Sequence, residues 1–183
     1  MLSLPLAFGT KLETVPGETP YLSANTAETA RWAERLGEGA GPRVGVAWSG
    51  NPGTTAHARR SLPLEQLARL LGTPGMRFVS LQKDAGSSGL PILDLMSEAN
   101  DFADTAALIA SLDLVISVDT AVAHLAGALG RPVWLLDRFD PDWRWLLGRR
   151  DSPWYPSLNI YRQPTAGDWG AVVDSVLADL RAR

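Results

Sequence analysis

From Arg43 onward, short apolar runs alternate with segments whose apolar residues recur at helical spacing. Short apolar runs bounded by polar or Gly/Pro-rich turns are typical of strands buried on both faces. We therefore expect strands at Arg43–Trp48, Met76–Gln82, Leu114–Val118, Val133–Leu136 and Leu158–Arg162, with Ile92–Leu95 as a candidate for one more short strand.

Apolar residues spaced by three and four positions predict amphipathic helices between these strands. One helix carries Pro63 in its first turn, and its expected buried stripe is Leu64, Leu67, Ala68 and Leu71. A second is expected to be capped by Asp104 and to bury Thr105, Leu108, Ile109 and Leu112. A third runs from an Asp119 cap to Leu129, before Gly130 and Pro132. The last spans about Asp168–Leu180, with a stripe of Trp169, Val172, Val173, Val176, Leu177 and Leu180.

Strands that alternate with helices in this way favour a doubly wound, Rossmann-like α/β domain around a mostly parallel sheet. Residues 1–42 differ, since they are rich in proline and glycine and predict only one helix, over Thr26–Leu36. We interpret residues 1–42 as a connector and residues 43–183 as the domain. Ligands of such sheets bind beyond the carboxyl ends of the strands, so a site is expected in the loops that follow them.

Composition narrows the functional classes. The formal net charge of −3 argues against a general nucleic-acid binder, which needs a basic face. The absence of cysteine excludes disulfides and thiolate catalysis, and two histidines far apart in sequence give no metal-ligand spacing, so no metal is expected. The G-x-G-x-x-G, G-x-x-x-x-G-K-[ST] and G-x-S-x-G motifs are missing, which disfavours a dinucleotide cofactor, a P-loop and a hydrolase. No apolar run approaches the ~20 residues that span a bilayer, and no signal peptide is expected.

The strongest candidate for chemistry is V-I-S-V-D-T-A-V-A-H-L-A-G-A-L-G-R-P, over Val115–Pro132. A strand is expected to end here and a helix to open, so unpaired N–H groups and the helix dipole favour a phosphate. Asp119 is expected to accept from ligand hydroxyls, Thr120 and Ala121 to offer N–H groups, and His124 to lie one turn further on. The alternative is an Asp119 that only caps the helix and a His124 satisfied within the core.

The loop after the first strand is a second candidate. Ser49 and Asn51 offer hydrogen bonds, Gly50 permits close backbone approach, and Arg60 offers a guanidinium to phosphate. The alternative is a solvated loop with exposed arginines.

Two weaker candidates follow. After the second strand, Gln82 could read a base edge and Lys83 could offset phosphate charge, with Asp101 and Asp104 as partners for ribose or sugar hydroxyls. A helix cap and a plain surface lysine explain the same residues equally well. In the aromatic loop Asp137–Pro156, Trp143 or Trp145 could stack on a base or sugar, although aromatic clusters more often serve packing.

The segment D-T-A-V-A-H-L-A-G-A-L-G-R-P resembles glycosyltransferase family 9, the heptosyltransferase-like enzymes. Together with W-S-G-N-P, R-R-S-L-P-L, V-S-L-Q-K and P-D-W-R-W-L-L, it is similar to a subgroup in which the domain ends bacterial tetratricopeptide-repeat proteins. The resemblance covers Arg43 to the C-terminus. It implies the C-terminal, nucleotide-sugar-binding half of a GT-B glycosyltransferase, with residues 1–42 as a linker and remnant of the missing N-terminal half.

The resemblance also implies roles. Asp119, Thr120, Ala121 and His124 would bind the diphosphate and sugar of the donor, and Arg60 lies where the family places a phosphate-binding lysine. Ala121 departs from the family's glycine, which puts a heptose donor in doubt. The implied reaction is inverting and metal-independent, needs no cofactor, and draws its base from the other half.

The same resemblance implies a cytoplasmic protein, peripheral at the inner membrane at most, whose partners are a nucleotide sugar and an acceptor hydroxyl. Three other functions remain open. The chain could be a non-catalytic nucleotide-sugar-binding module, a GT-B nucleotide-sugar epimerase, or an assembly module that makes a protein contact through its aromatic loop.

Overall fold

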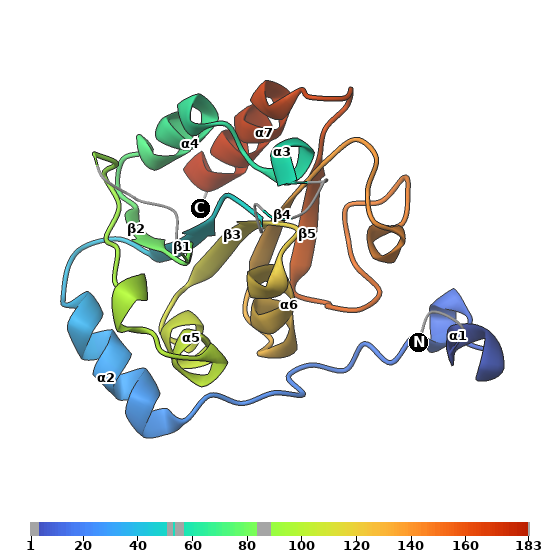
Figure 1. Ribbon diagram of the computed structural model, residues 1–183, viewed down its shortest axis with the longest axis horizontal. Coiled ribbons are helices and arrows are strands. Elements are labelled where there is room, and N and C mark those ends of the chain that lie inside the picture. Colours follow the sequence, from blue (N-terminus) through green and yellow to red (C-terminus); the bar gives the residue numbers. More distant parts are fainter. Residues whose placement is uncertain (1–3, 51–52, 54–56, 84–88, 183) are drawn as a thin grey trace.

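The computed structural model describes residues 4–50, 53, 57–83 and 89–182. Its centre is a sheet of five strands in the order β2-β1-β3-β4-β5, with every neighbouring pair parallel (Figure 1). The strands are β1 (Arg43–Ala47), β2 (Arg77–Ser80), β3 (Leu114–Val118), β4 (Val133–Asp137) and β5 (Leu158–Arg162). This sheet confirms the predicted α/β class.

Helices cover both faces of the sheet. The helices in the described part of the chain are α1 (Leu4–Ala7), α2 (Thr26–Leu36), α3 (His57–Arg60), α4 (Leu64–Leu71), α5 (Phe102–Ala110), α6 (Ala121–Ala128) and α7 (Trp169–Arg181), with short 3-10 turns η1 (Leu12–Thr14), η2 (Met96–Glu98) and η3 (Trp143–Trp145). One core cluster joins α4 and α7 to the sheet, and the other joins α2, α5 and α6 (Figure 1). All residues of β3 and β4 are buried, as expected of strands covered on two sides.

Several expected elements are confirmed. The predicted bounds of α2, β3 and β5 agree with the structure, and all six residues of the α7 stripe are buried. The four residues expected on the buried side of α5 are buried as well.

Other expectations are wrong. Ile92–Leu95 is not a strand, because only Leu93 makes a single bridge, to Val79. The stripe of α4 is rotated: Leu64 is 64% exposed and Leu70 is buried. Pro63 is the N-cap of α4 and lies just before its first turn.

Two helix caps are also displaced from the predicted residues. Asp101, not Asp104, caps α5, because its Oδ1 accepts from the amides of Ala103 and Asp104 at 2.8 and 2.9 Å. The N-cap of α6 is Thr120, whose backbone is extended, so Asp119 lies one residue too early to cap the helix.

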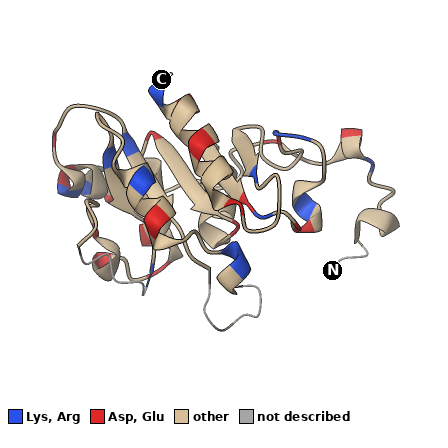
Figure 2. Ribbon diagram, turned by 90° about the horizontal axis from the view of Figure 1, so that it is seen from above, with Lys and Arg blue, Asp and Glu red and all other residues tan. Residues whose placement is uncertain are grey.

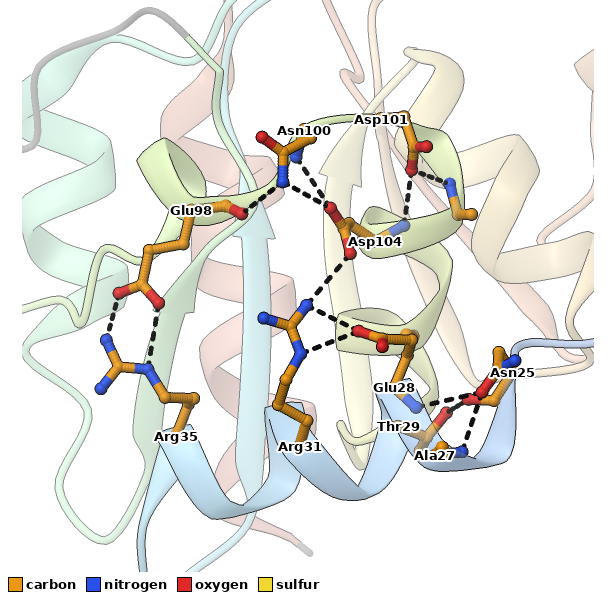
Figure 3. Close-up of polar contacts among 12 residues, drawn as sticks. Asn25, Ala27, Glu28, Thr29, Arg31, Arg35, Glu98, Asn100, Asp101 and Asp104 are labelled. Atoms are coloured by element: carbon orange, nitrogen blue, oxygen red, sulfur yellow. Dashed lines mark hydrogen bonds and ion pairs between the residues drawn. The ribbon is translucent and has the colours of Figure 1, made fainter.

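Helix α2 packs as part of the domain. Trp32 is fully buried in the core cluster of α5 and α6. Figure 3 shows two arginines of α2 reaching toward acidic residues of α5 and η2: Arg31 contacts Asp104 of α5 at 3.2 Å, and Arg35 makes two hydrogen bonds to Glu98 of η2. The described structure therefore joins this part of residues 1–42 to the sheet domain, while the origin of the segment in another half stays an interpretation.

The arm before α2 crosses the end of α6. The amides of Tyr21 and Leu22 both donate to the carbonyl of Ala128, at 3.0 and 3.2 Å. Helix α1 lies apart from the sheet and its covering helices (Figure 1).

Both outer strands pair with a further piece of chain. On the β2 side, Leu93 donates to the carbonyl of Phe78 and accepts from the amide of Ser80, at 3.0 and 2.8 Å. On the β5 side, Ile160 donates to the carbonyl of Arg150 at 2.7 Å, and the neighbouring residues Asp151 and Asn159 form an antiparallel bridge.

Candidate functional site

A cavity of about 990 Å³ opens at the carboxyl ends of β1, β2 and β3. The sheet order reverses between β1 and β3, because β1 leads to β2 on one side and β3 leads to β4 on the other. Such switch points are where doubly wound sheets bind ligands. The cavity wall combines the loop after β1, the end of β2, and the first residues of α5 and α6.

The start of α6 forms one side of this cavity through Thr120, Ala121 and Val122. Thr120 has φ −140° and ψ 173°, and the helix begins at the next residue. Its hydroxyl lies 3.1 Å from that of Ser117 and makes no capping hydrogen bond to the helix. A helix start that borders a cavity in this way presents its first N–H groups and its positive dipole end to a ligand.

Arg60 places a positive charge on the same cavity. Its Nη1 donates to the carbonyl oxygen of Asp119 at 3.1 Å, which ties α3 to the β3–α6 turn. Gly50 lies beside it, because a Cβ on Gly50 would be 3.4 Å from Cδ of Arg60. Gly50 and Ser49 line the cavity as well, whereas Asn51 lies outside the described residues.

Gln82 joins the ends of β1 and β2. Its Oε1 accepts from the amides of Trp48 and Ser49 at 3.2 and 2.8 Å, and its Nε2 donates to the carbonyl of Lys83 at 3.3 Å. Both Gln82 and exposed Lys83 line the cavity. Gln82 thus has a clear backbone-holding contact, and a role in reading a base stays a prediction.

His124 lies one turn into α6 and does not line the cavity. Its Nδ1 is 3.0 Å from the hydroxyl of Tyr155, its Nε2 is 3.7 Å from Oδ1 of Asp119, and its ring stacks on Trp145. Burial lowers the pKa of His124, against the opposing effect of the Asp119 carboxylate. The imidazole is therefore neutral at neutral pH.

The aromatic loop mainly supports packing. Trp145 is fully buried against His124. Trp143 is 50% exposed, meets Trp154 edge-on at 6.1 Å, and does not line the cavity. Stacking of Trp143 on a base or sugar stays a prediction, without support from the cavity wall.

Phe102 and its neighbours form a wall that the sequence reasoning missed. Phe102 is 65% exposed and lines the cavity with Met96, Ala99 and Asn100. Asp101 is also on this wall, while Asp104 is turned away and pairs with Asn100 and Arg31. The start of α5 reaches the same edge of the sheet as the start of α6, so the rule that drew attention to Asp119 could also have pointed to this wall.

The charges around the site are local. Figure 2 shows basic and acidic residues interspersed over the described part of the ribbon. Among the described residues, the charged side chains that line the cavity are Arg60, Lys83 and Asp101. Within the described ranges, no three histidines or carboxylates gather as a metal site, and no helix has the length and apolarity to cross a membrane.

Solved structures share this fold. The chain matches E. coli ADP-heptose lps heptosyltransferase II with a TM-score of 0.62 and 17% identity, over 93% of this chain and 55% of that one. It matches a family 9 glycosyltransferase from Veillonella parvula with a TM-score of 0.61 and 11% identity, over 92% of this chain and 55% of that one. The fold is therefore that of about half of such a GT-B heptosyltransferase chain.

Sequence comparisons agree with this fold. The model of glycosyltransferase family 9 (heptosyltransferase) matches residues 89–136, which include β3, α6 and the α5 wall. The chain is 32% identical to Protein FlbA of Caulobacter vibrioides over 92% of its own length. It spans only 30% of that relative and about half of the solved chains.

Proposed function

We propose that this chain is the donor-binding domain of a family 9-like glycosyltransferase and that its cavity binds a nucleoside-diphosphate sugar. One observation carries the proposal: the uncapped start of α6 and the guanidinium of Arg60 border the same cavity at the switch point of the sheet. Helix N–H groups and arginine are both suited to phosphate oxygens. The overlap of the family match with α6 supports the same choice.

The cavity suits a ligand of this size and mixed polarity. Its volume of about 990 Å³ is at the upper end of small-molecule sites, which run to roughly 1,000 Å³. In the proposed pose the diphosphate lies between Ala121 and Arg60, and the nucleoside lies toward Phe102 and Gln82. The similar fold of E. coli heptosyltransferase WaaC, solved with ADP-2-deoxy-2-fluoro heptose, supports a nucleotide sugar as the ligand class.

The proposed chemistry is an inverting, metal-independent transfer. An acceptor hydroxyl attacks the anomeric carbon, the bond from that carbon to the diphosphate oxygen breaks, and the hydroxyl proton passes to a base outside this chain. The described residues would stabilise the leaving diphosphate, because amides of the α6 start and the Arg60 guanidinium are fixed before charge develops. Asp119, which lies beside His124 and is not among the residues that line the cavity, would accept hydrogen bonds from sugar hydroxyls that extend past the cavity wall.

Calorimetric titration with UDP-, GDP- and ADP-sugars tests the proposal. We expect one of the three to bind, and Arg60→Gln to weaken that binding about 10- to 100-fold, as for the loss of a charge-assisted contact to phosphate. Arg59→Gln is a matched control: Arg59 is the neighbouring residue, pairs with Asp140 on the surface and does not line the cavity. Equal weakening by both variants, or no binding of any nucleotide to the folded chain, would contradict the proposal.

A second function is favoured by a specific surface. Phe139, Trp143 and Leu147 of the aromatic loop are 50%, 50% and 75% exposed. A protein contact through these side chains would make the chain an assembly module. Loss of self- or partner association in Trp143→Ala, with nucleotide binding intact, would support this function beside the first.

Several finer features belong to the proposal. We place the chain in a longer, tetratricopeptide-repeat protein of the cytoplasm, with an acceptor-binding half elsewhere in that protein. Two alternatives keep the same cavity: a non-catalytic binding module and an epimerase of the nucleotide sugar. Product analysis with the full-length protein separates these functions. Transfer releases the nucleoside diphosphate, epimerisation changes the sugar while it stays attached to the diphosphate, and a binding module leaves the nucleotide sugar unchanged.

A further inference from the structure

Two aromatic side chains that do not line the cavity hold His124 in place. Trp145 stacks on the imidazole with ring centroids 5.2 Å apart and planes inclined by 19°. The Tyr155 hydroxyl meets Nδ1 at 3.0 Å, and Asp119 faces Nε2 at 3.7 Å. Trp145 and Tyr155 both come from the aromatic loop, so that loop contacts one face of the ring and its Nδ1.

A glycine makes room for the tyrosine. Gly127 follows His124 by three residues, so both lie on one face of α6. A Cβ on Gly127 would lie 2.5 Å from Cγ of Tyr155. The ring therefore packs directly on the helix, and this packing does not depend on the hydroxyl.

Burial favours the neutral form of His124. Burial is the largest influence and lowers its pKa, while Asp119 and Asp142 act to raise it and Arg144 acts to lower it. Burial also raises the pKa of Tyr155, which therefore keeps its proton. A neutral imidazole has one N–H donor and one acceptor nitrogen, so the remaining question is which of the two nitrogens carries the proton.

The two sides of the ring decide this choice. An N–H on Nε2 lies 3.7 Å from the Asp119 carboxylate and is attracted to it, whereas a lone pair there would be repelled. Nδ1 must then accept, and Tyr155 must donate to it. The hydroxyl of Tyr21 lies 3.5 Å from that of Tyr155, and since either oxygen can be the donor, Tyr21 can donate to Tyr155.

We propose that Tyr155 is a positioning residue: its hydroxyl donates to Nδ1 and so holds His124 as the neutral Nε2–H tautomer. The Nε2–H donor then lies near Asp119, just outside the cavity wall, where a diphosphate sugar that extends past Thr120 would meet it. The distance of 3.7 Å from Nε2 to Asp119 is too long for a hydrogen bond, so this donor is available to a ligand. The imidazole side chain keeps 31% of its surface exposed. The part of the inference that concerns diphosphate rests on the proposed function.

Nitrogen-15 NMR of the imidazole tests the tautomer without any ligand. The chain has two histidines, so a His57→Gln sample assigns the His124 signals. We expect Nδ1 to appear as the unprotonated and Nε2 as the protonated nitrogen at neutral pH. Tyr155→Phe keeps the ring on Gly127 and removes the donor to Nδ1, which leaves only Asp119 to favour the Nε2–H form. We therefore expect a larger share of the Nδ1–H tautomer than in the wild type, and a roughly three- to tenfold loss of affinity for the bound nucleotide.

Two control variants separate positioning from simple packing. Tyr161→Phe also removes a buried hydroxyl, one that donates to Asp179, and it should change neither tautomer nor affinity. Tyr21→Phe should leave the tautomer unchanged, because Tyr155 still donates to His124. A wild-type Nδ1–H tautomer, or an unchanged tautomer in folded Tyr155→Phe, overturns the inference. If the tautomer behaves as stated and no nucleotide binds the wild type, only the proposed function fails.

Discussion

Replacing Asp137 by asparagine should change how the stability of this domain depends on pH. Asp137 is the last residue of β4 and is 1% exposed, with Oδ2 accepting from Nε of Arg162 at 2.8 Å. Burial nevertheless raises the pKa of its carboxyl from 3.8 to about 6, with Arg162 opposing the rise and Asp119 adding to it. The folded state therefore binds this proton more tightly than the unfolded chain does.

The sign and size of the effect follow from this difference. Because the folded pKa is the higher one, the stabilising contribution of Asp137 is complete below pH 3.8 and is lost as the pH rises through about 6. A rise of about two pKa units corresponds to about 3 kcal/mol. Asparagine does not titrate, so between about pH 4 and pH 8 the variant should gain about 2–3 kcal/mol relative to the wild type.

Urea unfolding followed by tryptophan fluorescence, at a series of pH values, measures this difference. His124 and the other carboxylates titrate in both proteins and cancel from it. Asp140→Asn is a matched control, because Asp140 has a side chain that is 57% exposed, and its difference from the wild type should stay flat. A flat difference for Asp137→Asn too would refute the reasoning, since Arg162 would then keep the carboxylate ionised at no cost.

Three further substitutions test the site and the fold. Ala121→Asp should weaken nucleotide binding, measured by calorimetry, at least about tenfold because the new carboxylate repels the diphosphate at the α6 start. Ala103→Asp, in the first turn of α5 and outside the cavity wall, is the control and should not weaken it. Gly127→Ala should destabilise the domain by about 1–3 kcal/mol because its Cβ meets the Tyr155 ring; an increase in melting temperature would count against that contact. Trp32→Ala should cost about 3–5 kcal/mol in urea unfolding, and a negligible loss would mean that α2 is an appended linker.

The spacing of apolar residues was sufficient to predict the buried residues where an element has a single apolar stripe or is apolar on all sides. The stripe of α7 and the all-buried run of β3 leave no choice of phase, and both agree with the structure. In α4, L-E-Q-L-A-R-L-L contains two overlapping stripes that share Leu67 and Leu71. Contact with α7 selects the one that includes Leu70, which the local sequence does not specify.

The part of the site that is formed by the loops directly after the strands could be predicted from the sequence. Thr120, Ala121, Ser49, Gly50 and Arg60 follow strand ends, and the structure gathers them on one cavity. The surroundings of His124 depend instead on how the aromatic loop returns to α6. An eight-residue helix that is apolar nearly all round carries no signal for that contact.

The paired outer strands of the sheet limit how this domain joins others. Unpaired strand edges are the usual template for adding a strand from a second chain. Here Leu93 pairs with the outer strand β2, and Arg150 accepts from Ile160 at the middle of the outer strand β5. A neighbouring domain or subunit would therefore be expected to dock against helices and loops and not to extend the hydrogen-bonded sheet.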